Sequence, residues 1–151
     1  MVALIVFFLL TAAAASAGAV FQPGEWYAAL QKPPLTPPDW VFPVVWSVLY
    51  AMIAFAGWFL WRARDRDSSG TLVIALWGAQ LVLNAAWSWI FFGLHLPGPA
   101  LAEIAVLWLA ILLVVVFGIR VHRVAAAMFV PYLLWVSFAA WLNFGIWRLN
   151  A

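Results

Sequence analysis

The sequence predicts an all-α integral membrane protein, with one domain (residues 1–151) that forms a bundle of five transmembrane helices and a proline-rich capping loop between the first two. Hydrophobic residues make up 69% of the chain and charged residues only 8%, whereas soluble domains carry about 25% charged residues. The charges fall in groups, and the apolar runs between them reach the roughly 20 residues that a helix needs to cross a bilayer. Strands of about ten alternating residues, the signature of a membrane β-barrel, are not seen.

The five apolar runs lie at about residues 2–21, 41–61, 71–93, 100–120 and 124–147. The first run contains Ala-Ser-Ala-Gly-Ala at residues 15–19, which resembles a signal-peptide cleavage site. No basic residue precedes this run, and it continues to Phe21. We therefore expect it to be retained as a transmembrane helix.

The connection at residues 22–40 is long for a helical bundle and holds five prolines: Pro23, Pro33, Pro34, Pro37 and Pro38. Proline fixes the backbone, so this segment is stiff, with a short helical turn expected at residues 25–30. A stiff loop of this kind can cap a cavity.

The second and third spans each carry polar and aromatic residues at helical spacing. The second has Trp40, Pro43, Trp46 and Tyr50, and the third has Trp77, Gln80, Asn84, Trp87 with Ser88, and Phe91. Residues three or four apart share one helical face, and an amide in hydrocarbon must face protein or ligand. Gln80 and Asn84 therefore either hydrogen-bond to neighbouring helices or line a ligand pocket.

The last span repeats this pattern beside Pro131, with Tyr132, Trp135, Ala139 and Asn143 on one face. Ala139 leaves a gap between larger neighbours. The gap either admits a ligand or allows a neighbouring helix to approach closely, as small residues do in membrane bundles.

Other residues suggest structural roles. Glu103 is expected near the start of its helix, within reach of lipid headgroups. Ala75 and Ala79 would let two helices approach closely, within the bundle or across a dimer. The indoles expected at span ends or on apolar faces, as interfacial residues, are Trp58, Trp61, Trp108 and Trp147.

Several classes of function are disfavoured. The chain has no cysteine, and His95 and His122 lack partners at metal-ligand spacing, so we expect no metal site. No catalytic constellation and no phosphate-binding glycine loop are present, which favours binding over catalysis, with no required cofactor and no nucleic acid. Basic residues favour an N-terminus inside the cell, because the second and fourth connections hold Arg62, Arg64, Arg66, Arg120 and Arg123.

The chain resembles the TspO/MBR family, the tryptophan-rich sensory proteins that include the mitochondrial translocator protein. The matching motifs occur in the family's order: Trp26-Tyr27, Lys32-Pro33, Pro37-Pro38-x-Trp40, Pro43, Trp46, Gln80-Leu-x-Leu-Asn84-x-x-Trp87, Phe91-Phe92-Gly93, Pro131-Tyr132-Leu-x-Trp135, Leu142-Asn143 and Trp147-Arg148. They extend over nearly the whole chain.

This resemblance implies a five-helix homodimer with a pocket, closed by the first loop, for porphyrins such as protoporphyrin IX, for sterols and for drugs of the benzodiazepine-receptor class. The pocket contacts that it implies are Trp40, Trp46, Tyr50, Asn84, Trp87, Trp135, Ala139 and Leu142. The family's sterol motif corresponds to Leu142, Phe144 and Arg148, with Phe144 where the pattern has tyrosine.

One departure concerns the loop, where many relatives have a tryptophan and this chain has Leu35. That indole is linked in the family to light-dependent porphyrin breakdown, so its absence makes an enzymatic role doubtful here. The resemblance thus favours a sensory binding protein first, a tetrapyrrole or sterol transporter second, and a porphyrin-degrading enzyme third.

Overall fold

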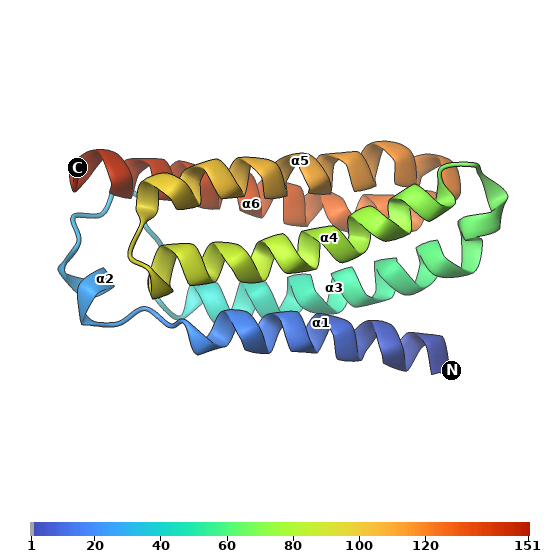
Figure 1. The fold of residues 1–151 in the computed structure, drawn as a ribbon, viewed down its shortest axis with the longest axis horizontal. Helices are drawn as coiled ribbons and strands as arrows, with labels where there is room; N and C mark the ends of the chain where they lie inside the picture. Colours follow the sequence, from blue (N-terminus) through green and yellow to red (C-terminus); the bar gives the residue numbers. More distant parts are fainter. Residues whose placement is uncertain (1) are drawn as a thin grey trace.

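A computed structural model, which describes residues 2–151, has five long helices, one short helix and two irregular helical turns (Figure 1). In chain order they are α1 Val2–Val20, α2 Glu25–Ala29, α3 Val41–Ala63, η1 Arg64–Arg66, α4 Gly70–Ser88, η2 Trp89–Gly93, α5 Pro97–Val121 and α6 Arg123–Leu149. Five of them are long and apolar enough to span a membrane. The chain is therefore a multi-pass integral membrane protein, as its composition predicts.

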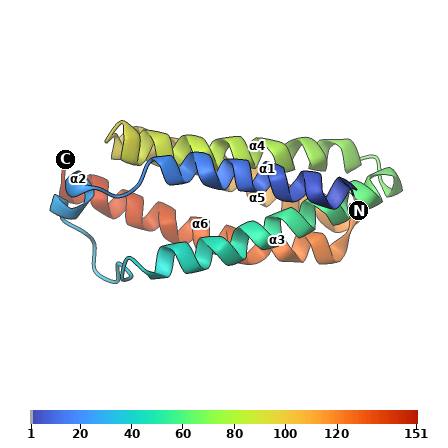
Figure 2. The ribbon, with the colours of Figure 1, turned by 90° about the horizontal axis from the view of Figure 1, so that it is seen from below.

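The five long helices form a ring in which α1 packs against α3 and α4, α3 against α6, α6 against α5, and α5 against α4 (Figures 1 and 2). Long helices that follow one another in the chain run antiparallel (Figure 1). The end of the bundle that carries α2 and the C-terminus is called the lid end here, and the end that carries η1 is called the arginine end (Figure 1).

The helix boundaries differ from the expected ones for local reasons. Helix α5 begins at Pro97 instead of residue 100. Proline is compatible with the first turn of a helix, because the backbone N–H that it lacks would have no partner within the helix there. The third span reaches Gly93 as expected, but its last turn, η2, is a wider π-helix in which Leu94 N–H donates to the carbonyl of Trp89 at 2.9 Å. The short helix expected near residues 25–30 is α2.

Three helices meet closely at Gly57 of α3. The indole N–H of Trp77 donates to the carbonyl of Ile53 at 2.9 Å, and Phe7 of α1 packs edge-on against Trp77 with ring centroids 4.6 Å apart. A Cβ atom at Gly57 would lie 2.5 Å from the Trp77 indole and 2.6 Å from the Phe7 ring. Glycine at this position therefore allows α1, α3 and α4 to pack together.

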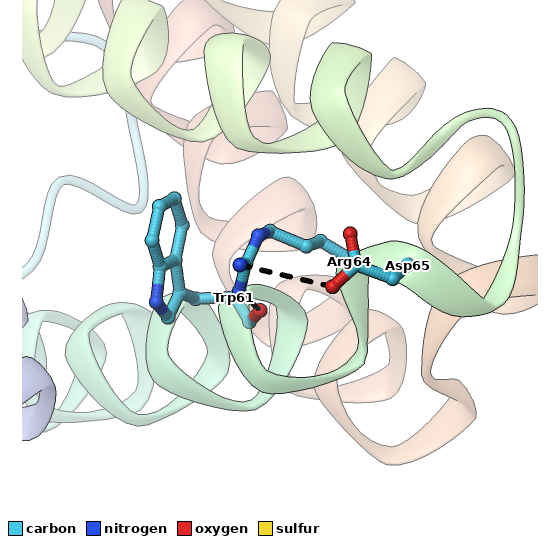
Figure 3. Close-up of polar contacts among 3 residues, drawn as sticks. All are labelled: Trp61, Arg64 and Asp65. Carbon is cyan, nitrogen blue, oxygen red and sulfur yellow. Dashed lines mark hydrogen bonds and ion pairs between the residues drawn. The ribbon is translucent and has the colours of Figure 1, made fainter.

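At the arginine end, two arginine side chains lie against tryptophan rings, and Figure 3 shows one of these pairs, Arg64 with Trp61. The Arg64 guanidinium lies 4.0 Å from the Trp61 ring centroid and donates to the Trp61 carbonyl at 2.7 Å. Arg62 lies 5.1 Å from the centroid of Trp58. Guanidinium and indole attract each other through the ring's quadrupole, and these contacts fit the interfacial position expected for both tryptophans.

Of the two positions expected for Trp108, a span end or an apolar face, the span end is wrong. Trp108 lies midway along α5, and its indole N–H donates to the Ser137 hydroxyl of α6 at 2.8 Å. An indole N–H inside hydrocarbon needs a partner, so this side chain ties two helices together.

Replacement of Gly57 by alanine is expected to lower the free energy of unfolding by about 1–3 kcal/mol, because the added methyl group overpacks the junction. Gly78→Ala is the matched control, since a Cβ there meets no atom within 4 Å. Equilibrium unfolding in detergent micelles measures both variants. Equal stabilities of the two variants would contradict this account of the junction.

Candidate functional site

A chain of polar contacts joins three helices inside the ring. The Tyr50 hydroxyl of α3 donates to Asn84 Oδ1 of α4 at 2.7 Å, and Asn84 Nδ2 donates to the Tyr132 hydroxyl of α6 at 3.1 Å. Asn84 is 5% exposed and Tyr132 is fully buried. Of the two roles expected for Asn84, hydrogen bonding to neighbouring helices is therefore confirmed. Its contact with a ligand stays a prediction.

Trp46 adds an aromatic wall beside this chain. It stacks on Tyr50, one helical turn away on α3, with centroids 5.3 Å apart and planes at 29°. It also meets Tyr132 edge-on at 6.0 Å. The residues predicted on α3 and α6 thus gather aromatic rings near the Asn84 amide, to which Tyr50 and Tyr132 are hydrogen-bonded.

A second set of hydrogen bonds lies nearer the lid end. The Trp87 indole N–H donates to Asn143 Oδ1 at 3.0 Å, and Asn143 Nδ2 donates to the carbonyl of Pro97 at 2.7 Å. Trp87 also stacks on Phe91 at 5.0 Å. These bonds join α4, α6 and the start of α5, and the ligand contact expected for Trp87 stays a prediction.

The other predicted pocket residues are less central. Trp135 lies at the contact of α3 with α6, edge-on to Phe42 at 5.8 Å, Leu142 is buried and Ala139 is partly buried. Trp40 is 68% exposed at the start of α3, apart from the cluster. The ligand contacts expected for these four residues stay predictions.

Trp135 also borders an apolar groove of about 560 Å³ on the outer side of the bundle. The groove is lined by Val44, Val45, Val48, Leu49, Met52, Pro131, Leu134, Trp135 and Phe138. Several of these side chains are more than half exposed, so the groove opens toward the lipid.

The capping loop, residues 22–40, is attached to the lid end by ring contacts. Trp26 of α2 stacks on His95 with centroids 4.3 Å apart and planes at 12°, and Tyr27 meets Phe92 edge-on at 5.4 Å. The Lys32 ammonium lies 4.6 Å from the Tyr27 centroid. Burial raises the pKa of the Tyr27 hydroxyl, and the charge of Asp39 raises it further.

A second attachment joins the capping loop to the end of α6. The Gln31 N–H donates to Asn150 Oδ1 at 3.0 Å, and Asn150 Nδ2 donates back to the Gln31 carbonyl at 2.9 Å. Pro33 packs onto Gly145, where a Cβ would lie 2.8 Å from the proline ring. Sequence reasoning missed this pairing, because nothing local marks two residues 119 positions apart as partners.

Leu35 and two of the three sterol-motif residues lie on the surface. Leu35 has a positive φ of 68° and is 83% exposed in the capping loop. Leu142 is buried, whereas Phe144 is 45% exposed and Arg148 lies on the surface, 6.0 Å from the Phe144 centroid. The three residues of the sterol motif therefore do not share one helical face.

The histidines have structural contacts. His122 caps α6 by accepting the Ala125 N–H at 3.2 Å and stacks on Phe59 at 5.1 Å, while His95 stacks on Trp26. Within residues 2–151, no group of three or more metal-ligating side chains is present.

Two polar side chains in the bundle lack the partners expected for them. Gln80 donates only to the Trp77 carbonyl of its own helix at 2.9 Å, and its oxygen is buried without a partner. Gln80 therefore does not hydrogen-bond to a neighbouring helix, and that expectation was wrong. Both carboxylate oxygens of Glu103 are also buried without a partner, so Glu103 does not reach the headgroups as expected.

Substitution of Asn84 by leucine is expected to lower the free energy of unfolding by about 1–2 kcal/mol, because two interhelical hydrogen bonds are lost at roughly 0.6 kcal/mol each and two hydroxyls lose a partner. Gln80→Leu removes the same carboxamide group from the same helix face and loses only an intrahelical bond. Equilibrium unfolding of both variants is the measurement. A larger loss for Gln80→Leu than for Asn84→Leu would refute the assignment.

Comparison with known proteins agrees with these features. A sequence model described as the TspO/MBR family matches residues 3–148. Protein CrtK of Rhodobacter capsulatus is 39% identical over 96% of this chain and 91% of its own length. The tryptophan-rich sensory protein of Cereibacter sphaeroides is 38% identical over 91% and 85%, and the translocator protein of Homo sapiens is 35% identical over 88% and 81%.

Proposed function

Because the chain belongs to the TspO/MBR family, we propose that it is a membrane receptor that binds a flat apolar ligand, such as protoporphyrin IX, between its helices. The observation that carries this proposal is the Trp46–Tyr50 stack, which stands edge-on to Tyr132 inside the ring. Flat ring faces beside a few fixed polar groups are the usual lining of a site for an apolar ligand. The ligand needs no cofactor in order to bind.

The same contacts supply a way to report that the site is filled. A flat ligand that inserts against Trp46 takes the place of the ring contact with Tyr132, and Tyr132 is held by Asn84. Since Asn84 also holds Tyr50, occupancy changes how α3, α4 and α6 are joined. A partner that recognises this arrangement would read the state of the receptor.

Transport of a tetrapyrrole or sterol is the second candidate. The groove beside Trp135 favours it, because this groove opens to lipid next to residues expected to line the pocket. Transport predicts ligand flux across sealed proteoliposomes, whereas a receptor binds without flux. An exposed leucine at position 35 offers no indole for porphyrin photochemistry, so enzymatic breakdown is not proposed.

Trp46→Leu is expected to weaken the binding of protoporphyrin IX about tenfold, since an aromatic contact of this kind contributes roughly 1 kcal/mol in addition to its buried area. Titration in lipid nanodiscs, followed by quenching of tryptophan fluorescence, measures the affinity. Trp61→Leu is the control, because Trp61 lies at the arginine end against Arg64. An unchanged affinity in Trp46→Leu, with wild-type binding intact, would remove this wall from the site.

We also propose that two copies of the chain associate through α4. Ala75 and Ala79 lie one turn apart and are both exposed on the outside of the bundle, so they are not used for packing within it. Ala75→Leu with Ala79→Leu is expected to convert dimers into monomers, as judged by subunit counting in nanodiscs, while Val116→Leu at an exposed position on α5 leaves them dimeric. A dimer that survives the double substitution would place the interface elsewhere.

A further inference from the structure

The interior of the ring holds hydrogen-bond acceptors that have no donor. Gln80 is fully buried, and its Oε1 has no partner. Glu103 is partly buried, but both of its carboxylate oxygens are enclosed and unpartnered, and within residues 2–151 it forms no ion pair. Burying an acceptor without a partner costs free energy, more for a charged group. Stability of the empty bundle alone therefore gives no reason for a glutamate at this position.

The position of Glu103 along the bundle follows from the alignment of α5 with α6. Three contacts fix this alignment: Gly98 with Trp147, Trp108 with Ser137, and Gly118 with Ala126. Because the helices are antiparallel, moving five residues forward from Gly98 and five back from Trp147 brings Glu103 level with Leu142. Leu142 is buried and is among the expected pocket contacts.

The neighbours at this level belong to the proposed site. Asn143 follows Leu142 and accepts the Trp87 indole N–H, so α4 also contributes a predicted pocket residue at about this depth. The Trp87 indole N–H donates to Asn143 Oδ1, and Asn143 Nδ2 donates to the Pro97 carbonyl. Neither side chain donates to the Glu103 oxygens, which have no partner.

We propose that Glu103 is a further ligand-binding residue, which accepts a hydrogen bond from an N–H or O–H group on the flat apolar ligand. This inference rests on the proposed function and narrows it, because a ligand that only fills space would leave the acceptor unpartnered. A carboxyl group offers an acceptor oxygen in either protonation state. Selectivity for donor-bearing ligands follows, since a site built to receive a donor rejects an analogue that lacks it.

A matched pair of fluorescent probes tests this selectivity. Pyrenemethanol and its methyl ether share one flat apolar body and differ in a single O–H donor. Energy transfer from the tryptophans to pyrene, measured in nanodiscs and displaced by protoporphyrin IX, reports binding at the site. The wild-type protein is expected to bind the alcohol about tenfold more tightly than the ether, the range for one hydrogen bond to a buried acceptor.

Substitutions assign the preference to one residue. Glu103→Leu is expected to bind both probes alike, Glu103→Gln to retain part of the preference through its amide oxygen, and Glu25→Leu, which changes an exposed carboxylate on α2, to keep all of it. Thermal unfolding should show Glu103→Leu to be at least as stable as the wild type, which a structural role for Glu103 would not allow.

The outcomes separate the two proposals. Equal binding of the two probes by the wild type, with both displaced by protoporphyrin IX, overturns the role of Glu103 and leaves the receptor intact. A preference that persists in Glu103→Leu also overturns it. If neither protoporphyrin IX nor pyrene binds, the receptor function fails and the role of Glu103 fails with it.

Discussion

The bundle is organised by the need to pair polar groups where no water is available. In hydrocarbon, a donor or acceptor is satisfied by protein or remains a cost. Asn84 meets this constraint for three helices at once, because its carboxamide receives the Tyr50 hydroxyl and donates to Tyr132. Since these two tyrosines also carry the aromatic contacts of Trp46, one amide sets both the helix arrangement and the wall of the candidate site.

The features predicted correctly from sequence are those that repeat along a helix. Five apolar runs became five spans, and the spacing on α4 placed Trp77, Gln80 and Asn84 on one buried face. Spacing alone does not say what an inward-facing group touches, however. Gln80 and Asn84 share that face, yet one bonds within its helix and the other to two neighbours, because the outcome depends on which side chains the adjacent helices supply.

Contacts between distant segments were not predictable. Nothing local links Trp26 to His95 or Gln31 to Asn150, since each pair forms only after the helices have assembled. The span-end position expected for Trp108 was wrong for a related reason. An indole within an apolar run does not show that its N–H will bond to a serine hydroxyl on another helix. Glu103 was expected to reach the headgroups because it lies close to a helix start. Helix α5 begins about one turn earlier than expected, at Pro97, so Glu103 lies deeper along the helix and its carboxylate oxygens are buried.

The bond between Gln31 and Asn150 also constrains biosynthesis. Gln31 emerges from the ribosome after the first span, but Asn150 follows all five spans in the chain. This attachment of the capping loop therefore forms only after α6 has been made, whereas the contacts of Trp26 with His95 and of Tyr27 with Phe92 need only the chain as far as His95. The loop is thus held on one side before the last span is inserted and on both sides only afterwards, so its final position depends on a residue that follows the fifth span.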